Sequence, residues 1–199
     1  MKKILFVTGI RSDYFIQRPI INEVNKSKKL KEVLIVTGAH LKKKFGYTLN
    51  EIKKDKFNIK KIINNVKIGD NHYSRAKSAS LLLDGLVEFL KKNKVDIIIS
   101  PYDREESIAT ALAGAYLNIP VAHLGAGDRT RVNIDGVIRH SVSKLSNLFF
   151  CFTKKNADRI LKLGEEKWRV YNTGHVAIDR YKQTKFLSLS KIKKKLKIN

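Results

Sequence analysis

The sequence predicts an α/β fold with a doubly wound parallel sheet of the Rossmann-like kind. Short runs of apolar and β-branched residues alternate along the 199 residues with longer segments of helical period, which is typical of strands joined by crossover helices. The runs are apolar at successive positions, as expected of strands buried on both faces. Polar residues and glycines gather where the runs end, and ligands bind at that edge of an open parallel sheet.

The expected strands are short apolar runs bounded by turn residues. The clearest consists of consecutive isoleucines from Ile97 to Ile99, which Ser100 and Pro101 end. β-branched residues in such a short run favour strand over helix. In chain order, strands are expected at residues 4–8, 33–36, 59–63, 97–99, 121–124, 148–153 and 170–171.

The expected helices lie between these strands. Pro19 follows the first strand and is expected near the first turn of its helix, because an interior proline removes a helical N–H donor. Asn118 closes an alanine-rich helix, and Gly164 stops the helix before the last strand. Residues 173–179 are expected to form a turn. Helices are expected before and through Ile52 and at residues 74–92, 108–117, 134–145, 154–163 and 188–199.

The chain is strongly basic, with 41 Lys and Arg residues against 18 Asp and Glu and a net charge of +23. Such a charge raises nucleic acid or an anionic membrane as a partner. Here the lysines are spread through nearly every segment, and no nucleic-acid-binding motif or aromatic stripe accompanies them. We therefore interpret them as solvated surface and expect no nucleic-acid partner. The positive field would still attract an anionic small molecule.

Several classes of site are not expected. The turn after the first strand, from Gly9 to Asp13, is not a GxGxxG fingerprint, so we expect no dinucleotide cofactor, and no metal site is expected. Cys151 is the single cysteine, which excludes an intrachain disulfide and suits a small buried residue. The first apolar run is too short for a signal peptide and none reaches membrane-spanning length. We therefore expect a cytoplasmic protein with no membrane partner.

Polar residues that could carry chemistry follow two neighbouring strands. Asp103 comes after one strand, His123 lies on the next, and Asp128 and Asp135 come just beyond it. Parallel strands can bring such residues to one rim, the edge of the sheet where ligands bind. Each also has a structural alternative, because Asp103 or Asp135 could cap a helix and His123 could be a hydrogen-bonded core residue. The local pattern leaves these alternatives open.

Longer motifs resemble a known family. The chain reads YDREESIATALAGAYLNIPVAHLGAGDRT and NIDGVIRHSVSKLSNLFF. These are similar to the patterns GDRxExLAxALAxxxLNIPVAHIxGGxxT and IDExIRHxITKLSHLHF of the hydrolysing UDP-N-acetylglucosamine 2-epimerases, in particular the sialic-acid-pathway branch. Two earlier segments, VTGIRSDYFIQRPI and VTGAHLKKKFGYTLNEI, are similar to that family's TGTRADYxxxxPI and TGxHLxxxFGxTxxEI. The resemblance covers nearly the whole chain.

This resemblance implies a two-domain GT-B architecture with the active site in the cleft between the domains. Residues 1–182 would form the Rossmann-like amino-terminal domain, and residues 183–199 a basic linker or helix leading to a second domain that the chain does not contain. In the family, a base removes the proton at C2 of a UDP-sugar and UDP leaves from C1. Water then adds to the glycal, which gives N-acetylmannosamine and UDP without a cofactor. The resemblance also implies a homodimer.

By motif position, the resemblance makes Asp103, Asp128 and Asp135 acid–base candidates, together with His123. It assigns contacts with the substrate to Arg11, His40, Arg104, Arg139 and His140. Taken alone, Arg11 could instead form a surface ion pair and His40 could be an ordinary loop residue.

The chain departs from the family's pattern at several positions. Gly125 stands where the pattern has Glu or His, Gly136 where it has Glu, and Asn147 and Phe149 where it has His. Loss of one acid–base group lowers a rate by about 10²- to 10⁴-fold. We therefore expect the 199-residue chain alone not to release UDP measurably. Two other hypotheses are a non-catalytic fragment that keeps the fold and the first domain of a nucleotide-sugar glycosyltransferase, which shares this architecture.

Overall fold

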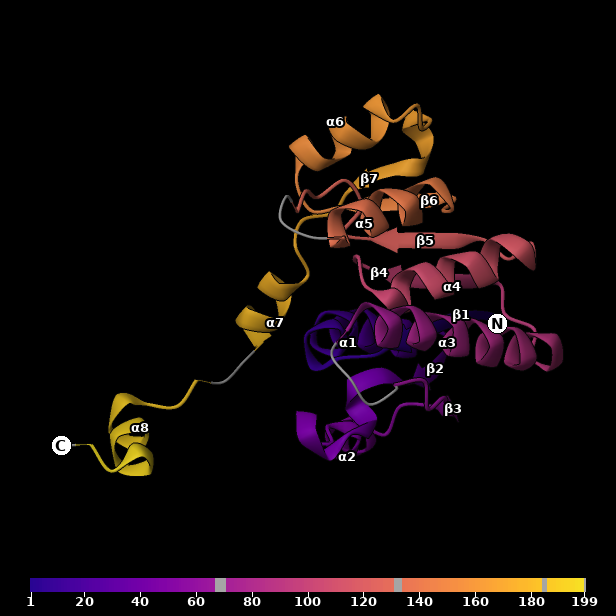
Figure 1. Ribbon diagram of the computed structural model, residues 1–199. Coiled ribbons are helices and arrows are strands. Elements are labelled where there is room, and N and C mark those ends of the chain that lie inside the picture. Colours follow the sequence, from indigo (N-terminus) through magenta and orange to yellow (C-terminus); the bar gives the residue numbers. More distant parts are fainter. Residues whose placement is uncertain (67–70, 131–133, 184–185, 199) are drawn as a thin grey trace.

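The structure, a computed structural model, describes residues 1–66, 71–130, 134–183 and 186–198. They form a parallel sheet in the order β3-β2-β1-β4-β5-β6-β7, with helices on both faces (Figure 1). The prediction of a doubly wound α/β fold is confirmed. The strands are β1 (Lys2–Thr8), β2 (Leu30–Val36), β3 (Ile59–Ile62), β4 (Ile97–Pro101), β5 (Val121–Leu124), β6 (Leu148–Cys151) and β7 (Val170–Asn172).

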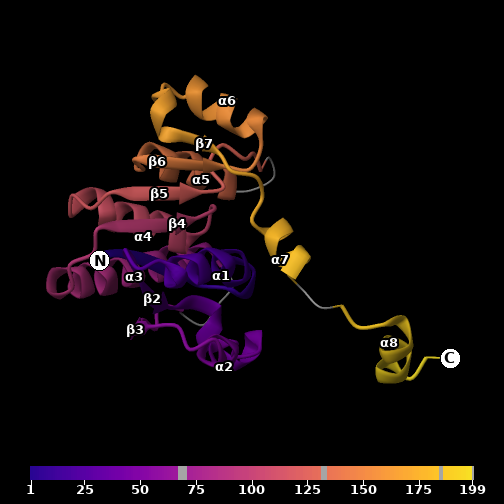
Figure 2. The same ribbon diagram turned by 180° about the vertical axis from the view of Figure 1, so that it is seen from behind.

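Alternate residues of the central strands pack into different layers. Leu5 and Val7 of β1 belong to the core under α3 and α4, whereas Phe6 lies in the core under α1. Figures 1 and 2 show the two helical layers from the front and from behind. Burial on both faces explains why the strand segments are continuously apolar. The α-helices are α1 (Arg11–Lys26), α2 (Leu49–Lys54), α3 (His72–Lys92), α4 (Glu105–Tyr116), α5 (Asp135–Lys144), α6 (Lys154–Lys162), α7 (Ala177–Gln183) and α8 (Leu189–Leu196), and the short 3-10 helices are η1 (Gly38–Leu41), η2 (Lys43–Phe45) and η3 (Lys167–Arg169).

Three expected element positions are wrong. Pro19 lies well inside α1 and not near its first turn, where its buried ring contributes packing that offsets the missing N–H. Residues 173–179 contain the start of α7, which contacts α1, so tertiary packing orders a segment that was expected to be a turn. The last helix ends at Leu196 and not at residue 199.

The last helix, α8, lies away from the sheet in both views (Figures 1 and 2). The expected domain boundary at residue 182 falls at the end of α7 and stays a prediction. Within the described ranges, none of the helices is long and apolar enough to span a membrane.

The strand order changes direction between β1 and β4. β2 and β3 follow β1 on one side, and the chain then crosses back so that β4 to β7 extend on the other side. Phe6 of β1 pairs with Ile99 of β4, so the Gly9 turn after β1 and the Asp103 turn after β4 open at the same carboxyl edge. In open α/β sheets, ligands bind at such a switch point.

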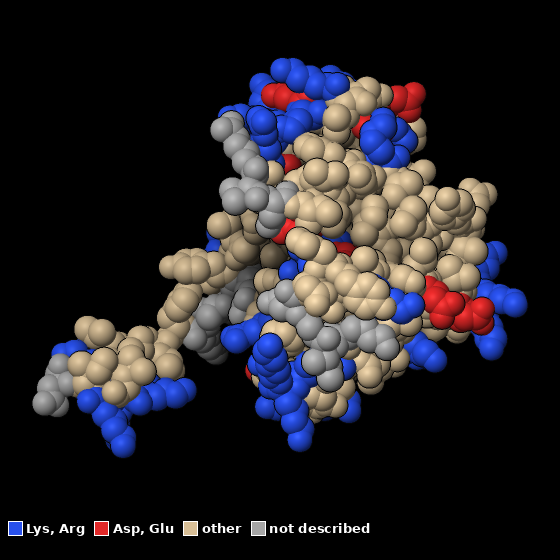
Figure 3. All heavy atoms as spheres, in the orientation of Figure 1, with Lys and Arg blue, Asp and Glu red and all other residues tan. Residues whose placement is uncertain are grey.

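Basic side chains gather toward the ends of the molecule. In Figure 3, Lys and Arg residues cluster over α6, α2 and α8, the surface over α4 and α5 is mostly uncharged, and acidic and basic side chains lie together at the far end of α3. On this face, the described residues form no continuous basic stripe of the kind that follows a nucleic-acid backbone. The lysine-rich composition is in keeping with solvated surface.

Candidate active site

A cavity of about 460 Å³ opens over the switch point between β1 and β4. Its wall comes from the turn after β1, the start of α4 and the first turns of α3. The guanidinium groups of Arg11, Arg75 and Arg104 line it, together with Glu105 and Glu106. A cavity of this size and charge can hold an anionic small molecule.

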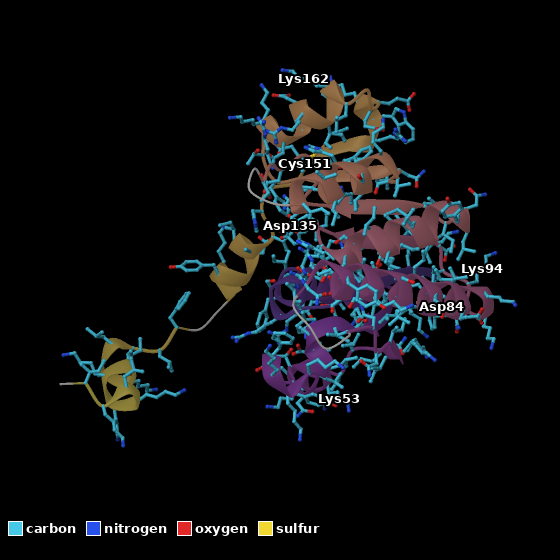
Figure 4. The ribbon with its side chains drawn as sticks, in the orientation of Figure 1. Lys53, Asp84, Lys94, Asp135, Cys151 and Lys162 are labelled. Atoms are coloured by element: carbon cyan, nitrogen blue, oxygen red, sulfur yellow. The ribbon has the colours of Figure 1, made fainter. Side chains whose placement is uncertain are left out.

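A chain of alternating charges runs along the cavity wall. Arg75 Nη2 lies 3.2 Å from both Asp135 Oδ1 and Glu105 Oε2. Arg104 lies 3.0 Å from Glu105 Oε1 and 3.3 Å from Glu106 Oε2. Each arginine therefore bridges two carboxylates. Asp135 lies in the first turn of α5 (Figure 4), directly after the N-cap position at Ile134, and the capping alternative for this residue stays open.

A second cluster is centred on Arg139 of α5, which is 5% exposed. Its guanidinium is ion-paired with Asp103 and lies 2.8 Å from the Asp128 carboxylate. The Asp103 side chain is 15% exposed and that of Asp128 is 50% exposed, so Asp128 is the more accessible to a ligand. No side-chain hydrogen bond caps α4, and Asp103 is therefore not a helix cap.

Two buried acids, Glu106 in the cavity wall and Asp13 close to it in charge interaction, were not predicted as site residues. Burial raises the pKa of Asp13, and the Glu106 carboxylate raises it further. Burial also raises the pKa of Glu106, with Glu105 adding to the effect. A Cβ on Gly9 would lie 2.4 Å from Glu106 Oε1, so only glycine allows this close approach. Glu106 matches the Glu of the GDRxE pattern, which is the signal that could have identified it.

His123 and His40 are both fully buried. His123 Nε2 donates to the Tyr102 carbonyl oxygen at 2.8 Å, and its Nδ1 lies 3.0 Å from Ser143 Oγ. The ring nitrogens of His40 lie 3.0 and 2.6 Å from two threonine hydroxyls. Desolvation lowers the pKa of His123 to about 3 and that of His40 to about 4, so both rings are neutral at pH 7. The geometry favours the core-histidine alternative for His123, and neither ring lines the cavity.

The other expected contacts, Arg11 and His140, are less constrained. Arg11 begins α1, is exposed, and places its guanidinium carbon 5.3 Å from the Phe15 ring centroid. Within the described part of the chain it takes part in no ion pair, so the surface-pair alternative is wrong and the group is available to a ligand. His140 Nδ1 is buried without a hydrogen-bond partner among the described residues, and burial, with Arg159 and Arg139 nearby, lowers its pKa.

The arrangement suits acid–base chemistry on an anionic ligand. Asp103, Asp128 and Asp135 lie around Arg139 and Arg75 at one edge of the sheet. A carboxylate held near a carbon acid can remove its proton, and guanidinium groups stabilise phosphate oxygens. In the parts of the chain that the structure describes, no three His, Cys, Asp or Glu side chains are grouped so that they could hold a metal ion.

Comparison with known proteins gives a consistent result. Residues 22–199 match the family described as UDP-N-acetylglucosamine 2-epimerase. A Legionella pneumophila protein named UDP-N,N'-diacetylbacillosamine 2-epimerase (hydrolyzing) is 35% identical over 185 residues, which are 93% of this chain and 49% of that protein. A Campylobacter jejuni protein named GDP/UDP-N,N'-diacetylbacillosamine 2-epimerase (hydrolyzing) is 35% identical over 197 residues, 99% of this chain and 51% of that protein.

A solved structure shares the fold. The crystal structure of UDP-GlcNAc 2-epimerase from Neisseria meningitidis bound to UDP-GlcNAc matches with a TM-score of 0.77 at 23% identity, over 97% of this chain and 52% of that one. This chain thus spans about half the length of the curated relatives it matches.

Proposed function

This chain belongs to the UDP-N-acetylglucosamine 2-epimerase family, and from that premise we propose that it supplies one wall of a site for a UDP-linked acetamido sugar. The proposed reaction converts UDP-N-acetylglucosamine and water to N-acetylmannosamine and UDP, for amino-sugar and sialic-acid biosynthesis in the cytoplasm. One observation carries the proposal: Arg11, Arg75 and Arg104 line a cavity at the switch point of the sheet, and Arg75 in its wall is ion-paired with Asp135. Asp103, which directly precedes Arg104, and Asp128 are both ion-paired with Arg139.

The reaction needs a base at C2 and stabilisation of the leaving diphosphate at C1. A carboxylate takes the C2 proton while the C1–O bond breaks and UDP leaves with the bonding electrons, which gives a glycal. Water then adds its oxygen to C1, and C2 receives a proton on the opposite face. Asp128 is the best-placed base because its side chain is 50% exposed, against 15% for Asp103 and 22% for Asp135. Asp103 and Asp135, held by arginines, complete the acid–base set.

Arg11 is the proposed first contact of the diphosphate. Its guanidinium lines the cavity and has no acidic partner among the described residues, whereas Arg75 and Arg104 already bridge carboxylates. Guanidinium groups bind phosphate through two parallel hydrogen bonds. The positive end of the α1 dipole lies at the same place, because that helix begins at Arg11.

The sugar is an acetamido sugar in this proposal. Two relatives at 35% identity are named as 2-epimerases of UDP-N,N'-diacetylbacillosamine. UDP-N-acetylglucosamine and UDP-N,N'-diacetylbacillosamine are therefore the two substrates to compare. A site that holds the second acetamido group would bind the diacetyl sugar more tightly.

We also propose a homodimer that forms through the face of α3, α4 and α5. Over α4 and α5 that face is mostly uncharged (Figure 3) in a chain of net charge +23. Tyr116 and Val137 on these helices are 84% and 66% exposed, and burial of such side chains favours association. Sedimentation at low and high salt tests the proposal, and a monomer at high concentration in both would refute it.

A second candidate function is binding of the nucleotide sugar without turnover. Gly125 and Gly136 offer no side chain as acid or base, and the two buried histidines already have internal partners. Much of the reduction in barrier comes from positioning, and this chain supplies one wall. Binding with no release of UDP would favour this alternative.

The test is calorimetric titration of the purified 199-residue chain with UDP and with both nucleotide sugars, with UDP release measured in parallel. We expect weak UDP binding that Arg11→Ala reduces by about tenfold, the effect of losing a charged hydrogen bond. Any turnover should fall at least about a hundredfold in Asp103→Asn. Asp84→Asn is the control, because Asp84 is exposed on α3 far from the Asp135 edge (Figure 4).

Two outcomes would change the proposal. A chain that binds neither UDP nor a nucleotide sugar would overturn it. Turnover near one per second by the chain alone would show that Asp103, Asp128 and Asp135 suffice and that a second wall is unnecessary.

A further inference from the structure

Tyr102 follows β4 with a left-handed backbone, φ 55°, which bulky residues rarely adopt. Both of its backbone polar groups are tied to β5. Its N–H donates to the Leu124 carbonyl oxygen at 2.9 Å, and its carbonyl oxygen accepts from His123 Nε2 at 2.8 Å. The neighbouring strand thus holds a strained residue at the edge of the candidate site, beside Asp103.

The Tyr102 ring occupies the space above Gly125. A Cβ added to Gly125 would lie 3.0 Å from Cδ1 and 3.1 Å from Cε1 of this ring. The ring centroid lies 5.7 Å from that of Phe152 and 5.9 Å from the guanidinium carbon of Arg139. The family's pattern quoted above has glycine at position 102, and the family has Glu or His at the position of Gly125. In this chain the large side chain is at position 102, as tyrosine, and position 125 is glycine.

The Tyr102 hydroxyl is buried and has no hydrogen-bond partner among the described residues. Buried polar atoms are nearly always paired, because an unpaired one loses its water without compensation. The ring packs against the apolar core on one side, but Arg139 beside it is ion-paired with Asp103 and Asp128, so charged groups of the candidate site lie next to this side chain. A phenylalanine would fill the same space without the unpaired hydroxyl.

We propose that the Tyr102 hydroxyl is a substrate contact, which donates a hydrogen bond to an acceptor oxygen on the sugar part of a UDP-linked acetamido sugar and takes the place of the side chain that Gly125 lacks. This inference rests on the proposed function and adds to it a residue that orients the sugar. The contact would satisfy a hydroxyl that the described residues leave unpaired.

The chemistry of the neighbours fits a donor at this point. Ionised carboxylates such as those of Asp103 and Asp128 only accept hydrogen bonds, so they can hold sugar hydroxyls but not a sugar carbonyl or ether oxygen. Burial, together with nearby carboxylates, raises the pKa of the Tyr102 phenol. The phenol therefore keeps its proton at neutral pH and serves as a donor and not as a base.

Access to the hydroxyl requires a side chain to move. Asp128 is the neighbour best able to do so, because its side chain is 50% exposed while that of Arg139 is 6% exposed. Rotation of Asp128 toward solvent would open a path to the phenol and would place the carboxylate beside the entering sugar.

The test compares dissociation constants for UDP-N-acetylglucosamine and UDP, measured by calorimetry on the 199-residue chain, Tyr102→Phe and Tyr171→Phe. Tyr102→Phe should weaken binding of the nucleotide sugar by about three- to tenfold, the effect of one neutral hydrogen bond, and leave UDP binding within about twofold. It should unfold at the same or a higher temperature, because the unpaired hydroxyl is gone. Tyr171 is 46% exposed on β7, the edge strand of the sheet, so its variant should change nothing.

The outcomes separate the inference from the function on which it rests. If the chain binds UDP-N-acetylglucosamine in an Arg11-dependent way and Tyr102→Phe binds it equally well, the inference is wrong and the proposed function stands. Equal weakening of UDP and the nucleotide sugar also overturns the inference, because the contact would not be with the sugar. If the chain binds neither ligand, the proposed function fails and the inference fails with it.

Discussion

Replacement of His40 should remove a large part of the acid sensitivity of the fold. His40 is fully buried, with its ring nitrogens 3.0 Å from Thr8 Oγ1 and 2.6 Å from Thr48 Oγ1. Desolvation lowers its pKa to about 4, against roughly 6.5 in an unfolded chain. Between these values the unfolded chain binds a proton that the folded protein does not. Stability is therefore lost as the pH falls from about 6.5 to about 4.

The size of the effect follows from the two pKa values. At pH 4.5 the unfolded state gains about 2.5 kcal/mol relative to the folded state from protonation of His40. That is a considerable share of the roughly 5 to 15 kcal/mol that stabilises a domain. His40→Asn will lower stability at pH 7.5, because it loses buried contacts. This deficit relative to the unmodified chain should shrink by about 2.5 kcal/mol at pH 4.5.

The assay is urea unfolding followed by far-ultraviolet circular dichroism at pH 7.5 and 4.5. Other groups titrate in this range, and the lowered pKa of His123 acts in the same direction while the raised pKa values of Asp13 and Glu106 act in the opposite one. Comparison of variant with unmodified chain cancels these contributions. His72→Asn is the control, because His72 is exposed at the start of α3. A deficit for His40→Asn that is equal at the two pH values would refute the reasoning.

Three further predictions concern the site. Burial raises the pKa of Asp13, so the folded state keeps a proton that the unfolded state loses, and stability falls as the pH rises above about 4. Urea unfolding should therefore show that Asp13→Asn stabilises the chain more at pH 8 than at pH 5. A larger stabilisation at pH 5 would contradict this. Arg139→Ala leaves Asp103 without its buried partner and should lower the free energy of unfolding by about 3 to 5 kcal/mol in the same assay. A decrease of less than about 1 kcal/mol would contradict this. Gly125 has φ +81°, and an alanine there would place its Cβ 3.0 Å from the Tyr102 ring. Gly125→Ala should therefore lower the free energy of unfolding by about 1 to 3 kcal/mol. If the ring is the obstacle, the same substitution should cost less stability in a chain that also carries Tyr102→Gly.

The layout of the fold could be derived from the sequence because it depends on residues that are close in the chain. Residues 121–124 were predicted as a strand and form β5 (Val121–Leu124), since a strand buried on both faces must be apolar at every position. Gly164 was predicted to stop α6, and it does so with φ 88°, which glycine adopts at little cost. Pro19 was misplaced, because its burial in α1 is a tertiary effect that local preference does not contain.

Part of the candidate site could also be derived from the sequence. Asp103 comes after β4 and Asp128 after β5, and parallel neighbouring strands bring their carboxyl ends to one edge. Composition and spacing left the caps and the core histidine as open alternatives, and the family resemblance supplied the roles. The buried acids Asp13 and Glu106 were missed because nothing in a local pattern shows that a carboxylate will be desolvated.

Only the tertiary structure decided which side chains meet. Arg75 reaches Asp135 across 60 positions and Arg139 reaches Asp103 across 36, contacts that depend on strand order and on how each helix is rotated against the sheet. Tyr102 stands over Gly125 for the same reason. Charge states follow from these contacts, because a pKa is determined by burial and by the charges and hydrogen bonds around the group in three dimensions.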